Sequence, residues 1–84
     1  MSFQQFNQLS KFPLPRNVKK EGIKKIIKVW KGNGYCFMQV ECGKGLEWRI
    51  RVDQSNGNVD YLIKGMRGDF WFTVSEDEVP FLEG

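Results

Sequence analysis

The chain contains no histidine, and this absence removes several kinds of chemistry at once. Sites that pair a serine or cysteine nucleophile with histidine need the imidazole as a base, so neither can be built here. Two cysteines without histidine also make a poor zinc site. A phosphate-binding Gly-x-x-x-x-Gly-Lys-Ser/Thr loop is missing as well. The sequence therefore predicts a protein that is not an enzyme and uses no cofactor or metal.

One segment has some of the oxygen ligands of a calcium loop. Asp53 and Ser55 belong to the run Asp-Gln-Ser-Asn-Gly at 53–57, and Asp60 follows it. A calcium loop of this kind needs a fuller ligand set and a closing glutamate, and both are missing. The composition of the run instead favours a tight turn between two strands.

Long apolar runs are also lacking, so no segment is expected to span a membrane. The N-terminus has neither the basic start nor the apolar run of a secretory signal. Cys36 and Cys42 fall in one expected strand, about 20 Å apart, which is too far for a disulfide. We interpret them as buried thiols of a reducing compartment, which predicts a cytoplasmic protein.

The chain is short and its charge is unevenly distributed. Its 84 residues allow one small domain, and 40% hydrophobic residues suit a folded one. The net charge of +3 is the sum of +6 over residues 1–42 and −3 over residues 43–84. Such asymmetry can mark a surface for nucleic acid or an acidic partner, and it equally fits a solvated exterior with an acidic tail.

The first third of the chain predicts an irregular arm followed by a helix. Residues 1–17 contain two prolines and several amides, so we interpret them as an arm, with the domain proper at 18–84. Over 18–31, Ile23, Ile26, Ile27 and Trp30 have the i, i+3, i+4, i+7 spacing of one helical face. Asn17 is a suitable N-cap, and a Gly-Asn-Gly sequence at 32–34 ends the pattern.

Lysines gather on the opposite side of this expected helix and form a candidate nucleic-acid surface. Its members are Lys20, Lys24, Lys25, Lys28 and Lys31. Such a row could follow a phosphate backbone, or it could simply keep the exterior soluble.

From residue 35 to 75 the sequence predicts four antiparallel strands. Apolar and polar residues alternate, and glycine-bearing turns separate the runs. A turn at 43–45 sets Val40 opposite Trp48, and every inward pair of that hairpin is then apolar. A four-residue loop at 54–57 brings Arg51 opposite Asp60, a favourable pair. Residues 80–82 could fold back as an apolar plug.

The predicted fold class is α+β, with one N-terminal helix packed on a four-stranded antiparallel meander in two layers. The alternative is a small SH3-like β-barrel in which residues 24–31 form a first strand.

The turn sequence has one family resemblance. A helix, then a hairpin, then Arg-Val-Asp-Gln-Ser-Asn-Gly-Asn-Val at 51–59 resembles the PepSY domain, whose last hairpin has an Asp-x-x-x-Gly-x-Val turn. The resemblance covers about residues 23–63. It implies a role in binding or inhibiting a partner protein and no chemistry.

The outward-facing residues of the predicted sheet suggest how such a protein would act. Aromatic and arginine side chains share this face and are typical of protein interfaces. The residues are Tyr35, Phe37, Arg49, Arg51, Leu62, Lys64 and Trp71. We predict a small accessory or inhibitory module that binds another protein there, unless a terminal segment covers the face.

Two other partners remain open. The lysine row together with Arg49 and Arg51 could bind nucleic acid. A second copy of the chain could pair through the sheet faces or through the expected edge strands Tyr35–Cys42 and Phe70–Ser75, giving a homodimer.

Overall fold

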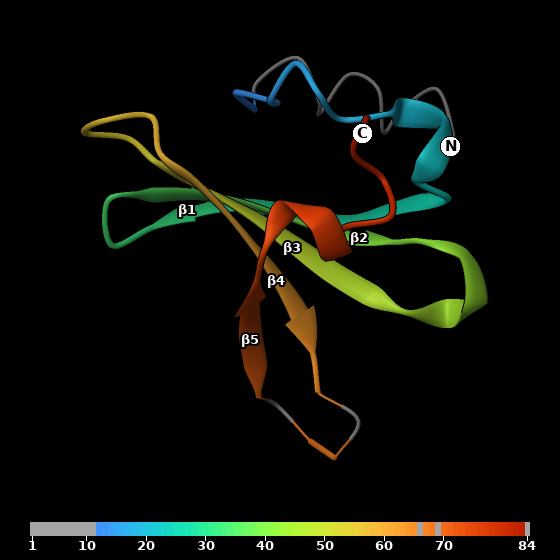
Figure 1. Cartoon of the computed structure of the whole chain (residues 1–84). Coiled ribbons are helices and arrows are strands. Elements are labelled where there is room, and N and C mark those ends of the chain that lie inside the picture. The colour runs from blue at the N-terminus through green and yellow to red at the C-terminus, as the bar shows by residue number, and fades with distance from the viewer. Residues whose placement is uncertain (1–11, 66, 69, 84) are drawn as a thin grey trace.

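The computed structural model describes residues 12–65, 67–68 and 70–83, and they form one five-stranded antiparallel sheet (Figure 1). Each strand pairs with its neighbour in the sequence, in the order β1-β2-β3-β4-β5. The strands are β1 (Lys25–Gly32), β2 (Tyr35–Glu41), β3 (Glu47–Asp53), β4 (Val59–Lys64) and β5 (Trp71–Val74). Helical structure in the described residues is limited to the short 3₁₀ turns η1 (Lys20–Gly22), η2 (Gly43–Gly45) and η3 (Glu76–Glu78).

The helix predicted over 18–31 is wrong, and the α+β class is wrong with it. The second half of this segment, from Lys25, belongs to strand β1, whose pairing with β2 shifts by one residue between Ile26 and Lys28. The extra residue of this β-bulge lets Ile26 and Val29 both pack inward although they are three positions apart. Trp30 lies on the other side with Phe37, and Ile27, the extra residue, is 41% exposed. The bulge thus imitates the spacing of a helix.

The alternative prediction, an SH3-like barrel with residues 24–31 as its first strand, agrees with the bounds of β1 to within one residue. In the described sheet, however, β1 and β5 are opposite edges that do not pair with each other. The sheet is therefore an open, twisted meander.

The strand register predicted from alternation and turn length is confirmed. Val40 pairs with Trp48, Met38 with Ile50, and the outward pairs follow the same register. In the next hairpin Arg51 lies opposite Asp60. Because side chains alternate between faces, this register decides which residues reach the core.

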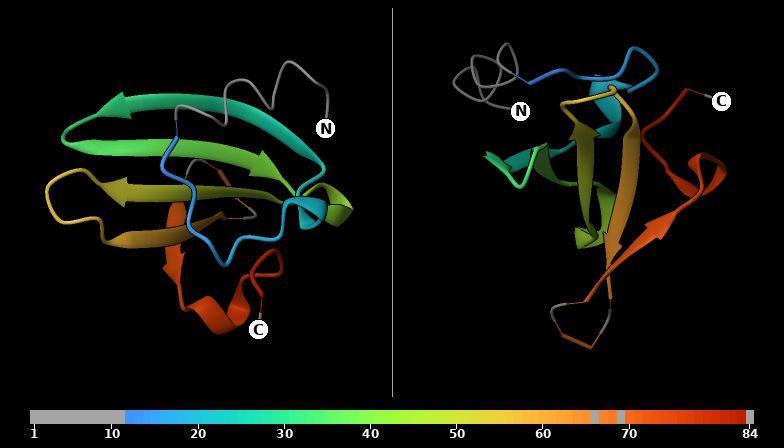
Figure 2. Two further views of the ribbon diagram at one scale, coloured as in Figure 1. Left: turned by 90° about the horizontal axis from the view of Figure 1, so that it is seen from above. Right: turned by 90° about the vertical axis from the view of Figure 1, so that its left-hand side faces the viewer.

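The two terminal segments close the inner face of the sheet, and both lie on the same side of it (Figure 2). They pair with each other through an antiparallel bridge between Val18 and Leu82. The N–H of Lys19 donates to the carbonyl of Phe81 at 2.7 Å. At Gly22 a Cβ atom would come within 3.1 Å of Phe81, so the absence of a side chain permits this close approach.

Phe81 is the centre of this closure. Its side chain is fully buried, and its ring meets those of Trp48 and Tyr61 edge to face at centroid distances of 5.7 and 6.1 Å. Of the apolar plug expected at 80–82, Phe81 and Leu82 fold back into the core, whereas Pro80 is exposed. Phe12, the first described residue of the arm predicted at 1–17, is buried in the same core; residues 1–11 lie outside the described residues.

Removing the ring of Phe81 should strongly destabilise the folded protein. We expect Phe81→Ala to lower the free energy of unfolding by about 3–5 kcal/mol, because it leaves a cavity between two layers. Urea denaturation followed by tryptophan fluorescence measures the change. Phe70→Ala, which removes the same ring at a 70% exposed position, is the matched control and should change stability by less than about 0.5 kcal/mol at low protein concentration. Equal losses in the two variants would contradict the closure described here.

Candidate functional site

The outer face of the sheet, opposite the core, carries a continuous layer of aromatic and charged side chains. These come from all five strands, since every second residue of each strand points outward. We define the outer layer as Lys28, Trp30, Tyr35, Phe37, Gln39, Glu47, Arg49, Arg51, Asp60, Leu62, Lys64 and Trp71.

Arg49 lies at the centre of the outer layer. Its guanidinium carbon is 4.0 Å from the ring centroid of Trp71 on β5 and 5.0 Å from that of Trp30 on β1. Trp30 stacks in turn on Phe37, at 4.9 Å between centroids and with an interplanar angle of 8°. One arginine on the middle strand therefore joins side chains from both edges of the sheet through cation–π contacts.

Hydrogen bonds fix the polar groups beside these rings. Arg49 Nε donates to Gln39 Oε1 at 3.1 Å, and Gln39 Nε2 donates to Glu47 Oε1 at 2.9 Å. Lys64 Nζ donates to the other oxygen of Glu47 at 3.2 Å. These donors lower the pKa of the Glu47 carboxyl, Lys64 contributing most, whereas partial burial lowers the pKa of Arg49. The chain of contacts holds each group in one orientation.

A second arginine is held at the other end of the layer. Arg51 donates from Nη2 and Nε to Asp60 Oδ2, at 2.7 and 3.1 Å, and its guanidinium carbon lies 4.9 Å from the Tyr35 ring centroid. The cross-strand pair predicted between Arg51 and Asp60 is thus present and forms a salt bridge.

The predicted partner-binding residues are brought together on this face, but they are not equally available. Tyr35, Phe37, Arg49, Arg51 and Trp71 are half-buried against one another. Two further members differ from this group: Leu62 is only 9% exposed, and Lys64 is engaged by Glu47. Trp30 belongs to the layer and was missed, because the helix prediction placed it on a buried helical face.

Neither described terminal segment covers the outer layer. Phe12 and Val18 from the first segment and Phe81 and Leu82 from the last are all buried in the core on the inner face. The alternative to partner binding was that a terminal segment covers this face. It is wrong for the C-terminal Phe81-Leu82 and for the described part of the N-terminal arm.

The lysine face of a helix does not exist, because the helix is absent. Lys24, Lys25, Lys28 and Lys31 instead lie exposed along and just before β1, which is an edge of the sheet. Lys28 Nζ is 4.8 Å from the Trp30 ring centroid. The backbone of Lys20 lies in η1, and its side chain is outside the described ones. A basic edge therefore borders the outer layer, with Lys25 and Lys28 on its outer side and Lys31, opposite Cys36, on its inner side.

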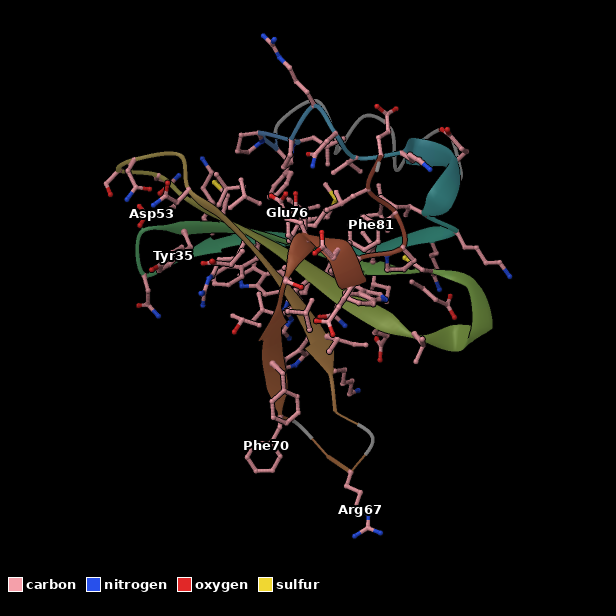
Figure 3. All side chains as sticks on the ribbon, viewed as in Figure 1. Tyr35, Asp53, Arg67, Phe70, Glu76 and Phe81 are labelled. Atoms are coloured by element: carbon pink, nitrogen blue, oxygen red, sulfur yellow. The ribbon has the colours of Figure 1, made fainter. Side chains whose placement is uncertain are left out.

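The carboxylate of Asp53 is hydrogen-bonded within the turn that follows β3. Asp53 Oδ1 accepts hydrogen bonds from Ser55 N at 2.8 Å and Ser55 Oγ at 2.6 Å, and these bonds lower the pKa of Asp53. The run from 53 to 57 is thus a hairpin turn, as its composition predicted. With Tyr35 and the β1–β2 turn it borders a shallow depression of about 460 Å³. Figure 3 labels Asp53 and Tyr35. Among the described residues, no three histidine, cysteine, aspartate or glutamate side chains are placed so that they could hold a metal ion.

Comparisons with known proteins identify no family. No family model matches the chain, and neither curated proteins nor solved structures give a match. The resemblance of residues 23–63 to a PepSY domain stays a prediction. In the described part of the chain, no helix has the length and apolar character needed to cross a membrane.

The two thiols lie on the inner face and are free. Cys36 accepts a hydrogen bond from Gln54 Nε2 at 3.2 Å. Burial, and secondly the charge of Glu41, raise the pKa of the Cys42 thiol from 9.0 to about 11. The thiolate is the reactive form, so Cys42 is poorly reactive at neutral pH in the folded protein.

Thiol labelling tests this burial. We expect Cys42 in the Cys36→Ala variant to react with a disulfide reagent at pH 8 at least about 100-fold more slowly when folded than in denaturant. The pKa of Cys42 is higher in the folded state than in the unfolded one, so ionisation of the thiol favours unfolding. Its contribution to the free energy of unfolding is therefore fully present below pH 9 and is lost as the pH rises toward 11. Rapid native labelling at pH 8 would contradict the position of Cys42.

Proposed function

We propose that this protein is a non-enzymatic interaction module whose outer layer binds another protein. The observation that carries the proposal is that the rings of Trp30 and Trp71 hold the Arg49 guanidinium between them on a face that no described segment covers. Tryptophan, tyrosine and arginine are the side chains that most often dominate binding energy at protein interfaces. Because these groups are already fixed, binding would lose little side-chain entropy.

The charge of the outer layer favours a protein over a phosphate backbone. Two of its four cations are neutralised within the layer, Arg51 by Asp60 and Lys64 by Glu47. The two remaining cations, Lys28 and Arg49, leave the layer only modestly positive around its stacked aromatic centre, which suits a partner with apolar side chains and a carboxylate for Arg49. A polyanion would instead meet Glu47 and Asp60 at close range, which is unfavourable.

Binding of single-stranded nucleic acid is the second candidate, and one observation favours it. The exposed lysines of β1 border Trp30, and a basic row beside an aromatic ring is typical of surfaces on which bases stack. This proposal uses Lys25, Lys28 and Lys31 from a strand edge together with Arg49 and Arg51. It replaces the helix face predicted from the sequence.

We further propose that the protein acts in the cytoplasm. Two buried thiols that remain free are typical of proteins from reducing compartments.

Affinity capture from a lysate of the source organism tests the proposed function. The immobilised chain should retain a protein partner after nuclease treatment and at raised salt. An Arg49→Ala, Trp71→Ala double variant should weaken that binding by about 30-fold or more, the effect of losing one dominant contact. Titration with the purified partner measures the change, and near-ultraviolet circular dichroism checks that the variant is folded.

The matched control is a Lys25→Ala, Lys31→Ala double variant, which changes two exposed residues of β1 and leaves the aromatic rings intact. It should bind the partner normally. Equal affinity of the arginine–tryptophan variant and the unaltered chain would refute the protein-binding proposal. Loss of the signal with nuclease, a steep salt dependence for a labelled oligothymidine, and a loss of binding in the lysine variant would instead support nucleic-acid binding.

A further inference from the structure

The two edges of the sheet differ in how they resist pairing with another strand. Edge strand β1 carries Lys25, Lys28 and Lys31 and contains a β-bulge, two features that discourage edge-to-edge association. Edge strand β5 has the sequence Trp-Phe-Thr-Val, with no charge, no proline and no register shift. Of the two edges, only β5 is therefore suited to accept another strand.

The β4–β5 hairpin extends away from the rest of the molecule (Figures 1 and 2). Phe70, which points to solvent near its end (Figure 3), is 70% exposed, and Phe72 is 55% exposed. A Cβ atom at Gly65 would come within 2.8 Å of the Phe72 ring, so this ring lies against a bare stretch of backbone. Together the two rings expose on the order of 250 Å² per chain.

The main chain of β5 also has hydrogen-bonding groups directed away from β4. Phe70 O accepts from Gly65 N at 2.7 Å, and Phe72 pairs with Ile63 in the same ladder. Because successive residues of an antiparallel strand direct these groups to opposite sides, the N–H and C=O of Trp71 and Thr73 face the free edge. No other described strand pairs with that edge.

Charges of opposite sign lie at the two ends of β5. Arg67 is exposed at the hairpin end (Figure 3), and η3, with Glu76, Asp77 and Glu78, follows the strand. Neither Arg67 nor these three carboxylates forms an ion pair among the described residues. Phe72 is the midpoint in sequence between Arg67 and Asp77.

We propose that β5 pairs with β5 of a second copy, antiparallel, across a two-fold axis at Phe72. In this register the free main-chain groups of Trp71 face those of Thr73 in the other chain. The two Phe72 rings meet in a non-hydrogen-bonded pair, where side chains are closest. Arg67 of each chain then lies at the same end as η3 of the other, so both charge contacts form twice.

Self-complementarity is what favours a second copy over an unrelated strand. The neutral strand pairs with itself without charge repulsion, and the reversal of direction matches each basic end with an acidic one. A two-fold contact also closes after two chains, as most symmetric protein dimers do. The two exposed phenylalanines offer about 500 Å² over both chains, below the roughly 1,200 Å² at which standard interfaces begin, so the dimer should be weak and dissociate on dilution. This proposal does not depend on what the outer layer binds.

Sedimentation velocity over a concentration series tests the dimer. The unaltered chain should change from monomer to dimer as its concentration rises. Phe72→Lys places two like charges at the axis and should raise the dissociation constant at least tenfold. Leu46→Lys, which likewise puts a lysine in place of an exposed apolar residue (44%) but in the β2–β3 connection, is the matched control and should leave the dissociation constant unchanged.

Charge reversal distinguishes this register from other contacts. Arg67→Glu and Asp77→Arg should each weaken the dimer severalfold, and the double variant should regain most of the loss because the pairs form again with opposite polarity. A chain that stays monomeric at all concentrations would refute the proposal. So would a dimer that tolerates Phe72→Lys, or single charge reversals whose effects simply add.

Discussion

A sheet with one apolar face must bury that face, and here the two ends of the chain bury it. The pairing of Val18 with Leu82 and the insertion of Phe81 between Trp48 and Tyr61 replace the helical layer that a two-layer protein of this size commonly has. Since both terminal segments are used on the inner face, none of the described chain is left to cover the outer one. The open aromatic and arginine layer is thus a consequence of how the core is closed.

The sequence was informative wherever side-chain alternation and turn length acted together. Val40 opposite Trp48 and Arg51 opposite Asp60 follow from the turns between them, because a shift of one residue would expose a row of apolar side chains. The main prediction placed a helix where β1 lies, and only the barrel alternative had a strand there, since the bulge lets Ile26 and Val29 share a face at helical spacing. Asn33-Gly34, interpreted as a helix end, is in fact a typical two-residue hairpin turn and was the available signal for this strand.

Errors in the candidate site follow from that missed strand. With β1 absent, β2 was expected to be an edge, and Trp30 was assigned to a helix. Alternation did predict that Arg49 points outward, but not that it reaches both Trp30 and Trp71, which lie on opposite edges of the sheet. That contact depends on the twist of five strands, which no local pattern encodes. The burial of Leu62 beneath the same layer has the same origin.

The bridge between Val18 and Leu82 also governs the order in which the protein can fold. Its partners are separated by nearly the whole described chain, so the contact closes one of the longest loops that the chain can form. During synthesis the five strands emerge before Phe81, and the inner face of the sheet stays open to water until that residue is available. Completion of the core is therefore a late event, and the nascent sheet is the species that most needs protection from aggregation.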